Sequence, residues 1–371
     1  MVTDSNYYLA LDLGIGLGTK IAIFKGTQLL LAEDILKVDS YGNNFQTYVE
    51  ALEEKIYFFL KNNNILQKDI LAAGIASAGI LKKDGSFQLI QNFPSFNGHN
   101  LKNIIQDKFN IPTLIDNDAN AGGLAEWSIL RMEILYWVFG GGWGGAWISK
   151  DGEVKYPSTD WNGKDSSLHP TNEPGYVISL NKLDLKSLFY EINGSYERFE
   201  KILLEEKGEK ALFGPFGKAD TLRAEFILSG PGRSRLFRAI VGDDNFYERF
   251  LDKKEAKKMS DPSVAGEYIS KLSGMRVESA INTDRLYGKI LAYATRELLK
   301  SAKKDGMPDN IPIYLGGKPS YALPYFGPST QRLLGKMGFM NYMRPSVIDE
   351  RGINANLMGA AVLASKALGV N

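Results

Sequence analysis

The chain has 371 residues, 44% of them hydrophobic and 23% charged, which is the composition of a globular protein long enough for two domains. Its 44 basic residues nearly balance 43 acidic ones, so a net charge of +1 provides no field for gathering nucleic acid or an anionic membrane. The lack of cysteine excludes disulfides and cysteine-ligated zinc, and a polar start without the layout of a secretion signal predicts a cytoplasmic protein.

The first part of the chain has the pattern of an α/β domain. Residues 7–12 and 20–24 are predicted strands, joined by a turn from Gly14 to Thr19 in which glycine alternates with other residues. They form a predicted hairpin that opens the fold. The domain continues with a strand at 28–34, an amphipathic helix at 45–62, a strand at 70–76, a helix at 101–109 and a strand at 111–115.

After residue 117 this pattern begins again. Residues 134–139 and 145–149 are predicted strands on either side of a second glycine-rich turn, Gly140 to Gly144. Helical periodicity then dominates 183–304 and includes a helix at 284–303, a strand at 311–315 ends at Gly316-Gly317, and a small-residue helix occupies 357–368. We therefore expect two α/β lobes with duplicated architecture, residues 1–117 plus 348–371 and residues 118–347, the second with a helical elaboration.

The stretch Asp116-Asn117-Asp118-Ala119-Asn120 lies where a predicted strand runs into a predicted helix. A carboxylate at the start of a helix can accept backbone N–H bonds and still present an oxygen to a ligand hydroxyl, as a general base must. Asn and Asp are also common helix caps, and an isolated pair of them would be read as structural. The surrounding motifs favour a catalytic role for Asp118.

Glycine-rich turns let backbone N–H groups approach phosphate oxygens where a Cβ atom would obstruct them. Asp12, at the end of a predicted strand, could bind the magnesium ion of a nucleotide directly or through water, and Lys20 is a candidate phosphate contact. Each turn alone is more typical of an ordinary hairpin. The sequence has no P-loop motif, and the first turn lacks the helix that follows a dinucleotide fingerprint.

Taken in order, these motifs resemble those of the ROK family of sugar kinases and related regulators, within the actin, heat-shock-chaperone and hexokinase ATPase superfamily. The resemblance implies a two-lobed actin-like ATPase (ribonuclease H-like) α/β fold, with duplicated mixed sheets and a cleft between the lobes. It implies that Asp118 is the base that takes a proton from a sugar hydroxyl, and that ATP and Mg²⁺ are the cofactors, with Asp12 at the metal. The implied nucleotide contacts are Asp12, Gly14, Gly18, Thr19, Lys20, Gly140, Gly141, Gly142, Gly144, Gly316 and Gly317.

Other segments resemble the sugar-binding elements of the family. Residues 92–98 resemble its sugar loop, residues 173–176 resemble Glu-Ile-Gly-His, and residues 190–195 resemble Leu-Glu-Ala-Tyr-Ala-Ser. Isolated glutamates are mostly solvated, so Glu173 and Glu191 are candidates only because the motifs keep the family's order. The implied sugar contacts are Gly79, Asn97, Gly98, Asn117, Asp118, Glu173, Tyr176 and Glu191.

The chain also departs from the family pattern. Tyr176 replaces a histidine that usually contacts both sugar and zinc, and the cysteine-rich zinc loop is cut short, so we expect no structural zinc. Gly141 stands where a threonine hydroxyl usually meets the phosphates, and the first hairpin is longer than in the family. The stretch 156–169 is an apparent insertion; its His169 is more typical of a surface or packing residue than of a catalyst.

We therefore expect an ATP-dependent, glucokinase-like sugar kinase that phosphorylates a hydroxyl of a hexose or an N-acylhexosamine. The alternative is a non-catalytic sugar-binding sensor of the same fold that has lost effective phosphate handling. A DNA-binding repressor fits less well, because only about six residues precede the first predicted strand. The expected partners are a small-molecule sugar and a second copy in a homodimer, with no nucleic acid and no membrane. The sequence does not identify the sugar.

Overall fold

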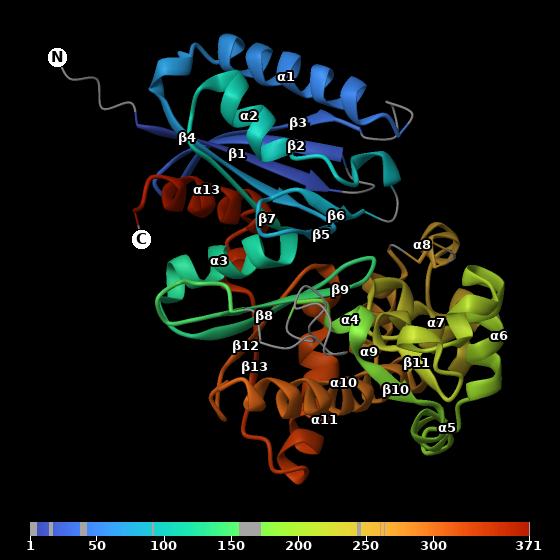
Figure 1. Cartoon of the computed structure of the whole chain (residues 1–371). Helices are drawn as coiled ribbons and strands as arrows, with labels where there is room; N and C mark the ends of the chain where they lie inside the picture. The colour runs from blue at the N-terminus through green and yellow to red at the C-terminus, as the bar shows by residue number, and fades with distance from the viewer. Residues whose placement is uncertain are drawn as a thin grey trace. The chain divides into compact units, whose positions relative to one another are not determined.

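The structure is a computed structural model of the chain, and it describes residues 6–14, 18–37, 43–90, 93–155, 172–242, 246–259, 261–262 and 264–370 (Figure 1). The middle of the first glycine-rich turn, Asn92 of the expected sugar loop and the expected insertion lie outside these residues. The chain divides into two compact units. Unit 1 consists of Met1–Tyr136, Ala146–Lys155 and Val347–Asn371, and unit 2 consists of Trp137–Gly145 and Tyr156–Ser346. The helix after Asn117 thus groups with unit 1, whereas the sequence led us to expect a change of lobe at residue 118.

Unit 1 is built on a five-stranded mixed sheet in the order β3-β2-β1-β4-β7. The strands β1 (Tyr7–Gly14), β2 (Gly18–Lys25) and β3 (Gln28–Leu36) form an antiparallel meander, because short turns join them. The strands β4 (Ile70–Ser77) and β7 (Thr113–Asn117) run parallel to β1, and each is reached through a helix. A separate hairpin in this unit joins β5 (Ile80–Leu81) to β6 (Phe87–Leu89).

Helices cover both faces of this sheet (Figure 1). On one face, α1 (Phe45–Asn62) and α2 (Leu101–Phe109) pack their apolar residues against alternate residues of β1 and β2, which gives the unit its main core. On the other face, α13 (Ala355–Ala367) packs on β1 and β4, and α3 (Asp118–Leu130) packs against α13. A Cβ atom on Gly74 of β4 would lie 1.8 Å from the carbonyl oxygen of Ala360, so only glycine allows α13 this close.

The second sheet has the order β13-β12-β8-β9. It contains the second predicted hairpin, β8 (Ile134–Phe139) and β9 (Trp143–Ile148), together with β12 (Ile313–Gly316) and β13 (Met343–Pro345). A small antiparallel sheet in unit 2 pairs β10 (Ser179–Asn181) with β11 (Thr221–Arg223). The sequence did not predict this pairing.

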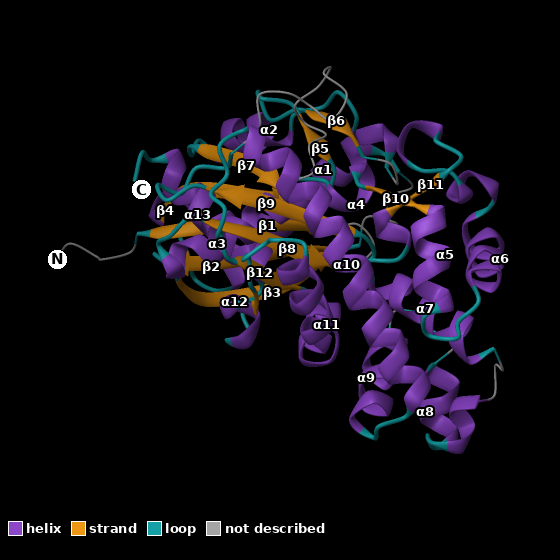
Figure 2. Cartoon of the chain, turned by 90° about the horizontal axis from the view of Figure 1, so that it is seen from below, coloured by secondary structure: helices purple, strands orange, loops and turns teal. Residues whose placement is uncertain are grey.

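Unit 2 is otherwise mainly helical, as Figure 2 shows for the region from α4 to α11. The predicted helix at 284–303 is confirmed, although it begins earlier, at Glu278. The described residues contain no helix that is both long and apolar enough to cross a membrane. The helices of unit 2 are α4 (Pro174–Val177), α5 (Lys182–Tyr190), α6 (Tyr196–Lys207), α7 (Gly230–Val241), α8 (Lys253–Lys258), α9 (Ala265–Gly274), α10 (Glu278–Lys304) and α11 (Leu323–Lys336), and α12 (Val347–Glu350) belongs to unit 1.

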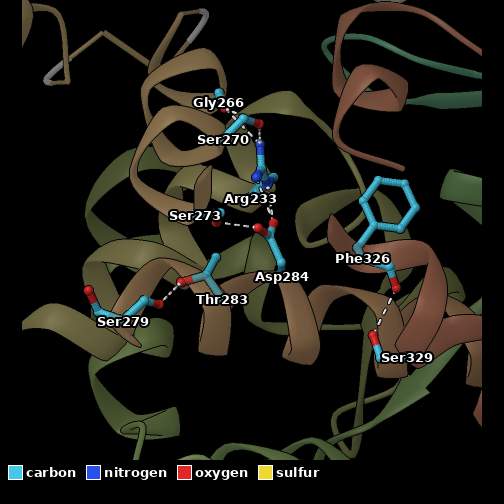
Figure 3. A network of polar contacts seen from close by, with 9 residues as sticks. All are labelled: Arg233, Gly266, Ser270, Ser273, Ser279, Thr283, Asp284, Phe326 and Ser329. Atoms are coloured by element: carbon cyan, nitrogen blue, oxygen red, sulfur yellow. Dashed lines mark hydrogen bonds and ion pairs between the residues drawn. The ribbon is translucent and has the colours of Figure 1, made fainter. Parts of the chain in front are cut away.

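A buried ion pair connects three of the helices in unit 2 (Figure 3). The Nη2 atom of Arg233 on α7 lies 2.6 Å from Oδ1 of Asp284 on α10, and each side chain is only 2% exposed. Nη1 of Arg233 donates to the carbonyl oxygen of Gly266 on α9, and Ser273 donates to Oδ2 of Asp284. Both charges are therefore paired and hydrogen-bonded, as burial of an ion pair requires.

Candidate functional site

Asp118 lies at the junction of β7 and α3, as the sequence predicted. Asn117 caps the helix, because its Oδ1 atom accepts hydrogen bonds from the backbone N–H groups of Ala119 at 2.8 Å and Asn120 at 3.4 Å. Oδ1 of Asp118 also accepts from Ala119, at 2.9 Å. Asp116 accepts from the backbone N–H of Asn117 and from the side-chain amide of Asn120. The half-buried Asp118 carboxylate is thus held in a fixed turn at the positive end of a helix.

Four of the expected sugar contacts gather beside this turn in unit 1. The side-chain amide of Asn117 donates to the carbonyl oxygen of Gly79, at 2.9 Å. A Cβ atom on Gly79, whose φ is +99°, would lie 2.6 Å from the side chain of Ile90. The backbone N–H of Ile90 in turn donates to Oδ1 of Asn97, at 2.8 Å. Gly98, which follows Asn97, has open space where its side chain would be.

Asp12 is a second carboxylate of interest in unit 1; it is buried, and two amide side chains hold it. Asn356 donates to its Oδ1 at 3.1 Å and Asn354, the cap of α13, donates to its Oδ2 at 3.4 Å. Lys20 lies opposite Asp12 in the β1–β2 register. Burial raises the pKa of Asp12, while the Asn356 hydrogen bond and the Lys20 charge act in the opposite direction.

The two carboxylates influence each other. Burial is the main cause that raises the pKa of Asp118 to about 6, and the negative charge of Asp12 is the next cause. A cation that binds near both groups would relieve this repulsion. The described residues contain no group of three His, Cys, Asp or Glu side chains that could hold a metal. Mg²⁺ does not need such a group, since it often uses one or two carboxylates and keeps several waters.

The raised pKa of Asp118 predicts how the Asp118→Asn variant changes stability with pH. Because the carboxyl group has an ordinary pKa of 3.8 when unfolded and about 6 when folded, its ionisation opposes folding, and this penalty grows between those two pH values. We expect the variant to be more stable than the wild type by about 1–2 kcal/mol at pH 8 and equally stable at pH 4. Urea unfolding at the two pH values measures this, and a variant that is less stable at pH 8 would show that the carboxylate is structural.

The candidate phosphate contacts of the first glycine-rich hairpin differ in which of their groups a ligand could reach. Gly14 pairs with Gly18 at the end of the β1–β2 ladder. Gly18 has a φ of +91°, and a Cβ atom there would lie 2.4 Å from the carbonyl oxygen of Leu36. The side chain of Thr19 is fully buried, and its hydroxyl lies 2.6 Å from the hydroxyl of Tyr48. Thr19 therefore has only its backbone to offer to a phosphate.

The second glycine-rich turn lies in unit 2 beside two other glycine positions. The carbonyl oxygen of Gly140 accepts a hydrogen bond from the backbone N–H of Gly230, the first residue of α7. A Cβ atom on Gly317, whose φ is +81°, would lie 2.0 Å from the carbonyl oxygen of Phe139. Gly141 itself has open space around it. The expected nucleotide contacts of unit 2 thus come from the β8–β9 turn and the end of β12, where Gly317 packs against Phe139. These contacts are Gly140, Gly141, Gly142, Gly144, Gly316 and Gly317.

Tyr176 and Glu173 lie in unit 2 next to a residue pair that the sequence analysis missed. Tyr176 is on α4, which Glu173 precedes as the cap residue. The guanidinium group of Arg223 lies over the Tyr176 ring, 4.3 Å from its centroid, and 3.7 Å from the carboxylate of Glu225. A Cβ atom on Gly142 would lie 3.3 Å from Oε2 of Glu225. Arg223 and Glu225 together therefore link Tyr176 to the second glycine-rich turn.

Glu191 does not join this group. Its side chain is 51% exposed and pairs with Lys289 of α10. In contrast, burial raises the pKa of Glu225, although Arg223 acts in the opposite direction. No periodicity or motif in the sequence pointed to Glu225, because its segment meets the region of α4 only through tertiary contacts. These include the β10–β11 pairing and the hydrogen bond from the backbone N–H of Ala224 to the carbonyl oxygen of Ile178.

Comparison with known proteins places these residues in context. Residues 8–153 match the ROK family. The xylose repressor of Caldicellulosiruptor bescii is 36% identical over 85 residues, which are 23% of this chain and only 21% of the repressor.

The fold also matches solved structures along nearly the whole chain. A ROK family glucokinase from Streptomyces griseus, in complex with glucose and AMPPNP, has a TM-score of 0.63 at 16% identity and covers 97% of this chain and 99% of its own. A ROK family transcriptional regulator, a homolog of the E. coli MLC protein, has a TM-score of 0.67 at 16% identity and covers 98% of this chain and 78% of its own. The expected α/β fold with mixed sheets is confirmed.

Proposed function

From the match of residues 8–153 to the ROK family, we propose that the chain is an ATP-dependent kinase for a hydroxyl of a hexose or an N-acylhexosamine. The observation that carries the proposal is the carboxylate of Asp118, fixed at the start of α3 with a pKa of about 6. A group with this pKa is mostly ionised at neutral pH and still basic enough to accept a proton in a transition state. The glucose and AMPPNP bound to the Streptomyces griseus relative give further support.

In this proposal Asp118 takes the proton of the sugar hydroxyl while the hydroxyl oxygen attacks the γ-phosphorus of ATP. The bond between that phosphorus and the bridging oxygen of ADP breaks, and ADP leaves. Asn117, Gly79, Asn97 and Gly98 form the surroundings that orient the sugar, because they are linked to one another and to the Asp118 turn. Asp12 would hold Mg²⁺, directly or through water, and the ion would neutralise charge on the phosphates. Asn354 and Asn356 keep the Asp12 oxygens oriented for this purpose.

Unit 2 contributes two groups of residues to the proposal. Gly141 and Gly142 offer backbone N–H donors to phosphate oxygens, whereas the N–H of Gly140 donates to the carbonyl oxygen of Gly142. Gly316 and Gly317 contact the adenosine. Tyr176, Arg223 and Glu225 are the proposed sugar contacts of this unit, in addition to Glu173. Glu225 takes the role that the resemblance assigned to Glu191, because it lies half-buried beside Arg223 and Gly142 with its side chain 26% exposed, whereas the side chain of Glu191 is 51% exposed.

A pair of glutamate variants tests this reassignment. We expect Glu225→Ala to raise the KM for the sugar at least about tenfold, since removing the carboxylate would leave the sugar hydroxyl that it binds without its hydrogen-bond partner. Glu191→Ala is the matched control, and we expect its KM to stay within about twofold, because it loses only an exposed ion pair. If steady-state kinetics showed a larger rise in KM for Glu191→Ala than for Glu225→Ala, the sugar contact would be Glu191 and not Glu225.

The second candidate function is a sugar sensor without kinase activity. Two observations favour it: Gly141 has no hydroxyl for the phosphates, and the Thr19 side chain is buried against Tyr48. An ATP-consumption assay over a panel of hexoses and N-acylhexosamines separates the two functions when thermal shifts are measured with the same sugars. A kinase consumes ATP with at least one sugar that raises the Tm, whereas a sensor shows the rise in Tm without consumption. The homodimer and the lack of zinc remain predictions, for light scattering and metal analysis to check.

A further inference from the structure

A basic cavity lies between α10 and α11 of unit 2. Its volume is about 300 Å³, and none of the residues around it belongs to the proposed active site. Two cationic residues come from each helix, and two hydroxyl side chains complete the polar lining. These residues are Arg285, Lys289, Tyr325, Ser329, Arg332 and Lys336.

The four cations are arranged in a way that opposes folding. Arg285 and Lys289 are four residues apart on α10, and Arg332 and Lys336 are four residues apart on α11. Like charges at this spacing lie on the same face of a helix and destabilise it. The repulsion within each of these like-charged pairs opposes folding rather than stabilising the helices.

Few acidic groups compensate these charges. Lys289 pairs with Glu191, while the one polar partner of Arg285 among the described residues is the side-chain oxygen of Asn282, at 3.5 Å. Arg332 and Lys336 are exposed and form no ion pair with any described residue. The sequence around α11 supplies no acidic counter-charge, because residues 310–348 contain no aspartate or glutamate. The cavity thus has an excess of positive charge.

Close packing of the two helices fixes the cavity's shape. A Cβ atom on Gly288 of α10 would lie 2.2 Å from Oγ of Ser329 and 2.3 Å from the carbonyl oxygen of Phe326. Ser329 donates to that same carbonyl group, which keeps its side chain against α11 (Figure 3). Because Gly288 allows α10 and α11 to pack closely, the two cationic pairs are carried by closely packed helices that line the same cavity.

We propose that this cavity binds a small phosphate-bearing anion, such as pyrophosphate or a phosphorylated sugar. Arginine presents a planar fork of donors that matches phosphate oxygens, and lysine adds a mobile point charge. The volume suits a compact ligand rather than a polymer. The proposal does not depend on kinase activity, since none of its residues belongs to the proposed catalytic or nucleotide groups.

The test is calorimetric titration of the full chain with inorganic phosphate, pyrophosphate and glucose 6-phosphate. We expect saturable binding of at least one probe, weakened at least about tenfold in the double variant Arg332→Ala/Lys336→Ala. The double variant Lys253→Ala/Lys254→Ala removes two exposed charges from α8 and should bind as the wild type does. Binding should also weaken as the salt concentration rises.

Three results would overturn the proposal. One is the absence of saturable binding for every probe at low salt. Another is equal weakening in both double variants, which would indicate net charge rather than a site. The last is unchanged binding in the Arg332/Lys336 variant, which would place the anion elsewhere. Loss of ATP-dependent activity in Asp118→Asn bears only on the proposed function, so the two proposals fail separately.

Discussion

Replacing Asp118 with Asn is expected to lower the turnover of sugar phosphorylation by about 10²-fold or more, the usual scale of a lost general base. The sugar should still bind with nearly unchanged affinity, because asparagine keeps the oxygen that accepts the Ala119 N–H and leaves the Asn117 cap intact. Steady-state kinetics and a sugar titration measure the two quantities. Asp107→Asn, an exposed change on α2, serves as the control with the same chemistry.

The pH dependence of turnover gives the same prediction a second readout. Since the pKa of Asp118 is about 6, the wild-type turnover should fall as the pH is lowered through that value and the base becomes protonated. Bound Mg²⁺ would move this limb to a lower pH, because a nearby cation favours the carboxylate. In Asp118→Asn the residual turnover should lack this limb. Unchanged turnover in the variant would eliminate the base from the proposed mechanism.

The Asp284→Ala variant is expected to lose about 3–5 kcal/mol of stability. The loss arises because Arg233, which is 2% exposed, would keep its charge in the interior without a counter-ion. Urea unfolding with the linear extrapolation measures the change. Glu205→Ala removes an exposed ion pair with Lys201 and should change stability by no more than about 0.5 kcal/mol.

The pKa of Asp284 also predicts the result of replacing both partners. Burial is the largest influence and raises this pKa, although Arg233 acts against it. The desolvation of the Asp284 carboxylate therefore destabilises its charged form more than the attraction of Arg233 stabilises it. The double variant Arg233→Met/Asp284→Leu should therefore recover most of the stability that Asp284→Ala loses. A loss below about 1 kcal/mol in Asp284→Ala, or no recovery in the double variant, would contradict this account of the network.

Local sequence patterns predicted the parts of the fold that have strong periodicity. The helix α1 begins and ends as expected at Phe45 and Asn62, because its apolar residues recur at helical spacing and Asn44 caps it. The position of Asp118 at the start of a helix was predicted in the same way, since its capping neighbours are adjacent in the sequence. In contrast, the strands β10 and β11 have three residues each and are separated by α5 and α6, so no local signal could pair them.

Contacts between distant residues account for what the sequence could not predict at the candidate site. Asp12 was expected at a metal, but its partners Asn354 and Asn356 come from the far end of the chain. Thr19 resembled a phosphate contact, yet the strand alternation turns its side chain toward Tyr48. Glu191 was a candidate because a short motif favoured it, whereas no local signal pointed to Glu225, and only the tertiary structure shows that Glu225 is half-buried and Glu191 exposed.

The most direct test is to incubate the chain with Mg²⁺, ATP and a panel of hexoses and N-acylhexosamines, and to detect sugar phosphate by mass spectrometry. We expect a sugar phosphate to accumulate with the wild type and the Asp107→Asn control, and to fall by about 10²-fold with Asp118→Asn. The central claim would be contradicted if a sugar raised the Tm of the wild type while no sugar phosphate formed, or if Asp118→Asn formed it as fast as the wild type.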